Sequence, residues 1–463
     1  MIQRAPALLL GFCIAGLAAY AADPLPSGPA SPTPAPSASP AAPTPSPTPG
    51  DVTVPLDGIA QMDMRDTTLA NFVATNSHGG FRWVSNTYDA AESTDPGLVL
   101  FQIPVYDVVV RFANSKMHEV DISFYNRGDS GNFTREKFEG LVQNCAKALT
   151  AFTKVQPTDP GKDAAGAVKA QALVWQTEKA RFLLESSFSR TGDTGFRAEF
   201  VRLTITEPEK PKSFMEESLA SMGVSSDSSG PKFSGAAHVK TMGNGDVLIE
   251  GIPMVDQGDK GYCVVASAER VLRYYGNKVD ENELAQIANT SLKEGTSPTA
   301  MLNALKKISD RLHVKTRTLL NLDNQQFDAM LDAYDQTARR GQRAPVLDRD
   351  VKDFTKLIKQ VKPDLLLEAR TKNPSDMDQF FRTVQARVNE GVPPLWSVMM
   401  GLFPKAKEDD EYGGHMRLII GYNPKTNEIL FSDSWGYGFE LERMPVNAAW
   451  TITDGVYSIE PLE

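Results

Sequence analysis

Two residues far apart in the sequence, Cys263 and His415, are of types that together carry nucleophilic chemistry. Cys263 follows the glycine-containing stretch 258–261 and opens an apolar face that recurs at helical spacing and stops at Gly276. A cysteine in the first turn of a helix is favoured as a thiolate by the positive end of the helix dipole. The thiolate also needs a base or a positive partner, which can come from a distant part of the chain because catalytic residues meet in space.

His415 is the candidate partner, and the residues around it predict a β-hairpin. It precedes the apolar stretch 416–420, a turn is indicated at 423–427, and the chain returns as 428–433, ending in Asp433. A hairpin of this kind brings the start of one strand near the end of the other. The Asp433 carboxylate could then accept the imidazole N–H and stabilise the positive charge of a thiolate–imidazolium pair.

Gln257 completes a set of four chemical roles. It lies six residues before Cys263, so its side-chain amide could act beside the Cys263 backbone N–H as an oxyanion donor. A single cysteine is ordinarily a small buried hydrophobic residue. The glycine-containing approach, the helix start, Gln257 and the predicted hairpin together favour acyl-transfer chemistry instead.

The same residues carry a family resemblance. The pattern Gln257-Gly258-x-x-Gly261-x-Cys263, then His415, then Asp433-Ser434-Trp435-Gly436, resembles the papain-like cysteine peptidases. The continuation Cys263-Val264-Val265-Ala266-Ser267, with Tyr274-Tyr275-Gly276 at the helix end, is similar to the bacterial branch related to bacteriocin-processing, double-glycine leader peptidases. The resemblance covers 246–463 and is strongest at the two ends of that range.

The resemblance implies a role for each of the four residues. Cys263 would be the nucleophile, His415 the general base and acid, Asp433 the orienting residue and Gln257 the oxyanion donor. Asp433 stands where plant and lysosomal enzymes have asparagine, and no aromatic residue follows Cys263, so papain-type subsite specificity does not carry over. The candidate residues of the substrate cleft are Gly261, Tyr262, Gly414 and Trp435.

The expected fold is α+β, with a papain-like catalytic domain in which the helix carrying Cys263 packs on an antiparallel sheet carrying His415 and Asp433. A helix is predicted from Ser375, with Asp378 as its capping partner, and a strand at 395–400. The acidic residues 408–411 are typical of a solvated loop, although a position before His415 would let them favour basic substrates.

A small α+β domain of unknown function is predicted at 51–212, before the catalytic domain. Strands are indicated at 98–101, 108–110, 120–124, 172–187 and 196–206, and a helix at 134–155. Cys145 falls on the core face of that helix, which predicts an inert thiol. Residues 213–245 are predicted as a linker, rich in Ser and Gly at 225–235, and a hairpin leading into the catalytic domain.

The N-terminus has the pattern of a secretory signal peptide at 1–21, with Arg4, an apolar run and the small-x-small site Ala19-Tyr20-Ala21. A secreted or periplasmic protein without an integral membrane segment is expected. Lipid attachment at Cys13 is less favoured, because the large Phe12 precedes it. Residues 22–50 are rich in Pro, Ala, Ser and Thr, which predicts a disordered, extended linker.

Composition limits the remaining classes of function. The 48 basic and 58 acidic residues give a net charge of −10, which argues against a nucleic-acid partner. Three cysteines and five histidines without metal-ligand spacing predict no metal and no cofactor. A disulfide between Cys145 and Cys263 would abolish the thiol hypothesis.

The sequence therefore predicts a cysteine peptidase that acts on peptide or protein substrates. Three alternatives stay open. The same residues could transfer the acyl group to an amine, as in transglutaminase-like relatives. The papain-like domain could be a non-catalytic scaffold of a cell-surface binding protein. The domain at 51–212 could also be an intramolecular inhibitor that is released by cleavage at 225–235.

Overall fold

The computed structural model describes residues 53–462, apart from 77–78, 161–167, 169, 191–194, 209–232, 259–260, 291–295, 352 and 404–411. The predicted signal peptide, the linker at 22–50, most of the Ser/Gly-rich stretch 225–235 and the acidic run 408–411 lie outside the described residues. The described residues all belong to one compact unit. Among these residues, no helix is both long enough and apolar enough to cross a membrane.

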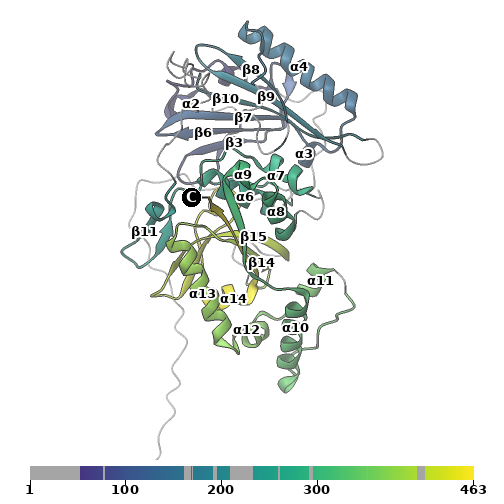
Figure 1. Cartoon of the computed structure of the whole chain (residues 1–463), viewed down its shortest axis with the longest axis vertical. Coiled ribbons are helices and arrows are strands. Elements are labelled where there is room, and N and C mark those ends of the chain that lie inside the picture. The colour runs from purple at the N-terminus through teal and green to yellow at the C-terminus, as the bar shows by residue number, and fades with distance from the viewer. Residues whose placement is uncertain are drawn as a thin grey trace, which may run out of the picture. The chain divides into compact units, whose positions relative to one another are not determined.

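The N-terminal part of the described chain is built on an antiparallel sheet (Figure 1). Its strand order is β2 (Arg82–Trp83), β3 (Ala90–Ser93), β6 (Asp107–Ala113), β7 (Lys116–Asn126), β10 (Arg197–Thr206), β9 (Arg181–Ser189) and β8 (Gln171–Gln176). A small separate sheet contains β1 (Val54–Pro55), β4 (Leu98–Leu100) and β5 (Ile103–Pro104). The helices here are α1 (Asp57–Ala60), α2 (Leu69–Thr75), α3 (Arg127–Ser130) and α4 (Arg135–Thr153).

Helix α4 forms where the sequence predicts it, because Thr134 accepts a hydrogen bond from Lys137 N as the N-cap and apolar residues recur on one face. Phe138, Cys145 and Leu149 are buried in the core that this helix shares with the sheet. The single strand predicted at 172–187 is wrong. The chain turns back after β8, where the Thr177 hydroxyl donates to the Ala180 carbonyl, and continues as β9.

The C-terminal part contains a second, larger sheet, in which all the described strand pairs are antiparallel. Its order is β11 (Val239–Thr241), β12 (Val247–Ile249), β15 (Gly413–Asn423), β14 (Leu395–Met400), β18 (Thr453–Pro461) and β13 (Val314–Asn321). The strand β16 (Glu428–Ser432) also pairs with β15, and β17 (Glu442–Pro445) pairs with β16. The hairpin predicted around His415 is the β15–β16 pair, and the strand predicted at 395–400 is β14.

Helices cover both faces of the second sheet. One core contains α6 (Cys263–Tyr274), α7 (Glu281–Ala288), α8 (Pro298–Lys306) and α9 (Ser309–Leu312). The other contains α10 (Asn324–Arg339), α11 (Phe354–Ile358), α12 (Pro363–Thr371), α13 (Pro374–Asn389) and α14 (Val446–Ile452). The short 3₁₀ helices η2 (Gly235–His238) and η3 (Arg340–Gln342) complete the described elements.

The central strands supply both cores from alternate residues, as a strand with helices on both faces must. In β15, Leu418 packs into the core with α6, whereas Ile419 packs into the core with α13. In β14, Leu395 and Trp396 divide in the same way. This arrangement places α6 directly against β15, which carries His415.

Two local features fix the ends of the helices that matter for the site. Helix α6 ends before Gly276, whose φ of +87° is a conformation that other residues rarely adopt. Helix α13 begins at Pro374 rather than Ser375, because Asn373 is its N-cap and accepts from Ser375 N. The predicted capping partner Asp378 is therefore wrong, and Asp376 contacts the Asn373 side chain instead.

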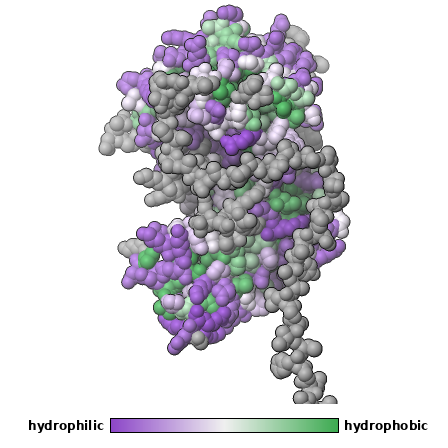
Figure 2. Space-filling view, turned by 180° about the vertical axis from the view of Figure 1, so that it is seen from behind, coloured by the Kyte–Doolittle hydropathy of each residue, from purple (hydrophilic) through white to green (hydrophobic). Residues whose placement is uncertain are grey.

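The predicted α+β class is confirmed by this mixture of antiparallel sheets and helices. On the face shown in Figure 2, apolar residues form separate patches among hydrophilic ones. Scattered apolar residues of this kind are ordinary on a protein surface.

Candidate active site

Cys263 is the first residue of α6 and carries a free thiol. Its side chain is partly exposed, and the helix behind it is anchored in the core by Val265, Ala268 and Leu272. The other described cysteine, Cys145, is also free and is buried in the N-terminal core, so no disulfide joins the two. Burial raises the pKa of the Cys145 thiol to about 12, as the prediction of an inert thiol requires.

The β15–β16 hairpin brings His415 and Asp433 together. Leu418 pairs with Ser432, so Asp433, the next residue, falls beside the part of β15 that carries His415. Asp433 Oδ1 lies 2.6 Å from His415 Nε2, and both side chains are buried. Because Nε2 is engaged with the carboxylate, Nδ1 is the ring nitrogen left for Cys263, with which His415 forms a side-chain hydrogen bond.

Interactions among Cys263, His415 and Asp433 shift the pKa of each side chain in the direction that favours its charged form. Burial raises the pKa of Cys263, but the hydrogen bond and the positive charge of His415 outweigh it and hold this pKa below its ordinary value. Burial alone would lower the pKa of His415, yet the Asp433 carboxylate raises it to about 10. Asp433 in turn has a pKa well below its usual range, because His415 and Arg417 outweigh its burial. The arrangement therefore favours a thiolate, an imidazolium and a carboxylate at neutral pH.

Two buried arginines hold the Asp433 segment in place. Arg417 Nε donates to Asp433 Oδ2 at 2.9 Å, and the Ser434 backbone N–H donates to Oδ1 at 2.8 Å. Arg270, on α6, donates to the Asp433 backbone carbonyl at 2.9 Å and to the Ser432 hydroxyl at 2.6 Å. The Cys263 helix is thereby linked directly to the Asp433 segment.

Gln257 is buried beside the same segment. Its backbone N–H donates to the Ser434 carbonyl at 2.8 Å, and the Ser434 hydroxyl donates to Gln257 Oε1 at 2.6 Å. A carbonyl end that accepts from Ser434 fixes the orientation of the amide. The NH₂ end is then the part of Gln257 that can serve as a donor.

The four candidate cleft residues differ in position. Trp435 stacks on the His415 ring, with centroids 4.7 Å apart, and so covers one face of the imidazole. Gly414 precedes His415 in β15, and Gly261 is exposed before α6. Tyr262 is only 2% exposed and packs in the core with α6, so it has almost no surface to offer a substrate.

The remaining described histidines lie elsewhere. His118 is in β7, His238 stacks on Phe233, and His313 follows α9. Across the described residues, no group of His, Cys, Asp and Glu side chains is arranged to hold a metal ion. His78 lies outside the described residues.

Sequence reasoning did not find Arg270 or Arg417. Arg417 lies within an apolar strand, where a single charged residue is ordinarily taken to face solvent. The available signal was its position two residues after His415, which places both side chains on the same face of β15.

The family comparison agrees with this site. Residues 249–457 match the Peptidase_C39 like family, a span that includes all four candidate residues. The match confirms, over these residues, the resemblance to this peptidase family that the sequence predicts.

Two solved structures are similar to this chain. One is the peptidase domain of Streptococcus ComA, a bi-functional ABC transporter involved in a quorum-sensing pathway, at 14% identity over 46% of this chain and 99% of that chain, with a TM-score of 0.24. The other is xylellain, a cysteine protease from Xylella fastidiosa, at 14% identity over 50% of this chain and 91% of that chain, with a TM-score of 0.26. Among the curated proteins, none matches significantly.

Proposed function

We propose that the protein hydrolyses peptide bonds through Cys263, His415 and Asp433. The observation that carries this proposal is the position of His415, which bonds Asp433 through Nε2 and forms a second side-chain hydrogen bond with the Cys263 thiol. This chain of contacts couples a nucleophile to a base and the base to an orienting carboxylate.

The first half of the reaction forms an acyl-enzyme. The Cys263 thiolate attacks the peptide carbonyl carbon, and the carbonyl oxygen becomes an oxyanion that accepts from the Gln257 NH₂ and the Cys263 backbone N–H. The tetrahedral intermediate then collapses with cleavage of the C–N bond. The proton of the His415 imidazolium passes to the leaving amine, and a thioester remains on Cys263.

The second half of the reaction releases the acid. Neutral His415 removes a proton from water, and the resulting hydroxide attacks the thioester through the same oxyanion arrangement. Cleavage of the C–S bond releases the carboxylic acid and restores the thiolate–imidazolium pair. Asp433 stays ionised throughout and stabilises the imidazolium in each half.

The proposal includes a secreted or periplasmic location. It is supported by the signal-peptide pattern at 1–21 and by the Pro-rich stretch 22–50 that follows it. The substrate class is a peptide or a protein, in keeping with the peptidase family whose pattern the chain matches.

The test is digestion of a mixed peptide library by the full protein, read by mass spectrometry as new N-termini and C-termini. We expect cleavage by the wild type and its loss in Cys263→Ala and His415→Ala, with Cys145→Ala as the matched control that keeps full activity. Addition of a primary amine separates hydrolysis from acyl transfer, since transfer yields an amide product instead of a free acid. Equal cleavage by Cys263→Ala and the wild type would overturn the proposal.

A further inference from the structure

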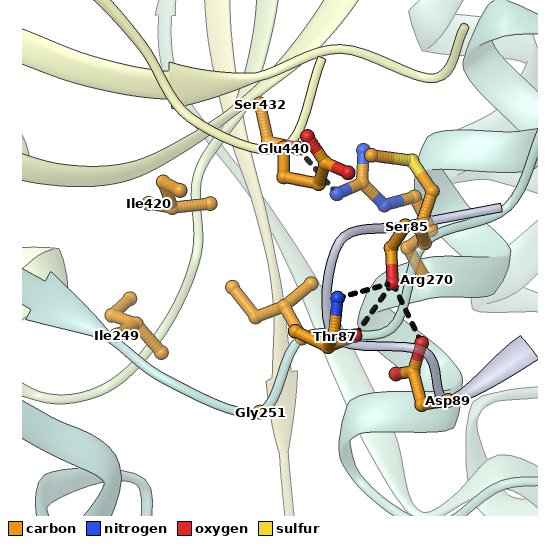
Figure 3. Close-up of a pocket in the computed structure, with 11 residues that line it drawn as sticks. Ser85, Thr87, Asp89, Ile249, Gly251, Arg270, Ile420, Ser432 and Glu440 are labelled. Atoms are coloured by element: carbon orange, nitrogen blue, oxygen red, sulfur yellow. Dashed lines mark hydrogen bonds between the residues drawn. The ribbon is translucent and has the colours of Figure 1, made fainter. Parts of the chain in front are cut away.

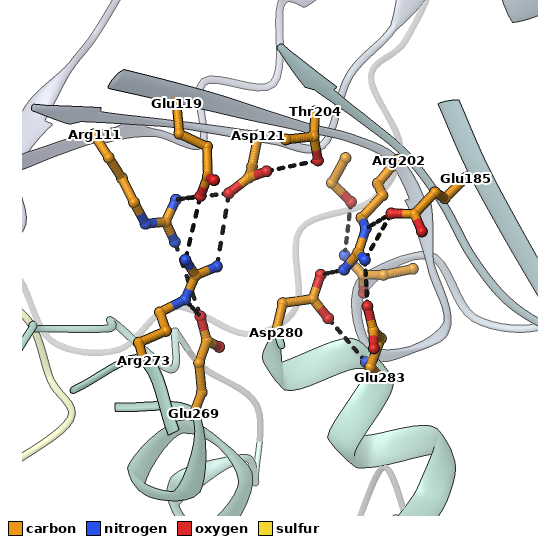
Figure 4. Close-up of polar contacts among 12 residues, drawn as sticks. Arg111, Glu119, Asp121, Glu185, Arg202, Thr204, Glu269, Arg273, Asp280 and Glu283 are labelled. Carbon is orange, nitrogen blue, oxygen red and sulfur yellow. Dashed lines mark hydrogen bonds and ion pairs between the residues drawn. The ribbon is translucent and has the colours of Figure 1, made fainter. Parts of the chain in front are cut away.

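The N-terminal module, defined as the described part of 54–206, contacts the peptidase domain through charged side chains that are buried or partly buried (Figure 4). In the first cluster, Arg273 of α6 donates to Glu119 of β7 at 3.2 Å. Arg273 also pairs with Glu269 one turn earlier on α6, at 2.6 Å. Arg111 of β6 lies 3.9 Å from Glu269 and 2.7 Å from Asp121, which completes a network of alternating charges.

A second cluster joins the module to α7. The guanidinium of Arg202, in β10, bonds Glu185 of the module at 2.7 Å and also bonds Asp280 and Glu283 of the peptidase domain. Glu283 is 1% exposed, and its burial raises its pKa to about 7 despite the opposing charge of Arg202. One arginine of the module therefore contacts two carboxylates at the start of α7.

A third contact joins the module to the segment that follows Asp433. The Asn86 backbone N–H donates to Glu440 Oε1 at 2.7 Å, in the segment that follows Asp433. Beside it lies a small cavity with Ser85, Thr87 and Asp89 of the module on one side (Figure 3). Arg270 and Ser432, which hold the Asp433 segment, also line this cavity.

The module thus contacts the structures that carry Cys263 and those that carry Asp433. Its charged contacts on α6 fall at Glu269 and Arg273, six and ten residues beyond Cys263. At 1.5 Å of rise per residue these positions lie roughly 9 and 15 Å along the helix from Cys263. These contacts therefore fix the C-terminal half of α6, away from the end that carries Cys263.

We propose that the N-terminal module is a permanent brace of the peptidase, which fixes the Cys263 helix relative to the Asp433 segment, and not an inhibitor that must be released. Buried ion pairs are costly to break by removal of one partner, because the other charge is left uncompensated. They also favour one docking register over others, since both charges must be matched at once. Of the expected effects of the brace, only the effect on turnover depends on the proposed peptidase function.

The test uses the full protein and the double variant Arg111→Met/Arg202→Met, which changes only the module's side of the interface. We expect hydrogen exchange of the backbone amides in α6 and α7 to rise by about tenfold or more. Alkylation of Cys263 by iodoacetamide at pH 7 should slow, because the thiol loses its fixed position against His415. The matched control Arg135→Met lies on α4 and pairs with Glu139 within the module, so both readouts should stay at the wild-type level.

Two results would overturn the brace. Unchanged exchange in α6 and α7 would show that the charged clusters do not hold these helices. Faster alkylation or turnover in the double variant would show that the module inhibits the site. Arg202→Lys provides a milder version, since one ammonium cannot match the three carboxylates that the guanidinium contacts, and it should shift exchange in the same direction.

These readouts separate the brace from the proposed function. Hydrogen exchange does not require a competent peptidase. A protein with faster exchange in the variant but without wild-type turnover would therefore support the brace and contradict the peptidase assignment.

Discussion

The Nε atom of Arg417 lies 2.9 Å from Oδ2 of Asp433, and both side chains are buried. The other carboxylate oxygen of Asp433 faces His415 and accepts from Ser434 N. Each oxygen of the carboxylate thus has its own charged partner. Arg417 therefore keeps Asp433 ionised and fixed in the rotamer that meets the imidazole.

Substitution of Arg417 by methionine should destabilise the protein strongly. Methionine keeps much of the side-chain volume but leaves a buried carboxylate with one charged partner fewer. We expect the free energy of unfolding to fall by about 3–5 kcal/mol, measured by urea denaturation at pH 7. Arg65→Met is the matched control, because Arg65 is exposed and pairs with nearby Asp63, and it should leave the stability nearly unchanged. Equal effects of the two substitutions would contradict this role of Arg417.

Asp433→Asn should shift the basic limb of the pH–rate profile. The Asp433 carboxylate raises the pKa of His415 to about 10, so the imidazolium persists up to that region in the wild type. Asparagine keeps a hydrogen-bond acceptor but removes the charge, and the pKa of His415 should then fall toward its ordinary value of about 6.5. The alkaline limb of kcat/KM should move to lower pH accordingly. Asp454→Asn, on the same sheet but bonded to Ser397, should leave the limb in place.

A basic limb that stays near pH 10 in Asp433→Asn would contradict this account. It would show that the limb belongs to a group other than His415.

The site was predictable where its signals are local. Turn residues and an apolar repeat mark the β15–β16 hairpin, and a glycine-containing approach with an apolar helical face marks α6. Arg417 and Arg270 were not predictable in this way, because their role depends on the register of the hairpin and on the packing of α6 against it. The burial of the Tyr262 ring was not predictable for the same reason, since proximity to Cys263 in sequence does not say which way the ring points.

The fold was predicted less completely between α7 and α13. Several helices lie there, and their apolar faces match surfaces of the sheet that no local pattern reveals. The contacts that Arg111 and Arg202 make with α6 and α7 were also missed, because Glu269, Asp280 and Glu283 are separated from these arginines by the whole linker. Charges at such distances in sequence are ordinarily interpreted as surface residues.

Gln257→Ala should separate peptide hydrolysis from simple thiol reactivity. Loss of one oxyanion donor is expected to lower kcat by about 10²–10³. Alkylation by iodoacetamide displaces iodide at a saturated carbon and forms no tetrahedral oxyanion, so its rate should change little. Ser434→Ala should give a smaller loss of kcat in the same direction, because it releases the Gln257 amide without removing it.

Parallel loss of turnover and alkylation in Gln257→Ala would argue against the oxyanion role. It would indicate instead that Gln257 maintains the Cys263–His415 pair itself.

The most direct test of the central claim is the rate of Cys263 alkylation by iodoacetamide as a function of pH, in the wild type and in His415→Ala, read peptide by peptide with mass spectrometry. Cys145 serves as an internal control in every sample, because burial raises its pKa to about 12. We expect fast labelling of Cys263 that persists below about pH 7, and its loss in His415→Ala. Slow labelling that rises only near the free-thiol pKa of about 8.5, unchanged in His415→Ala, would contradict it.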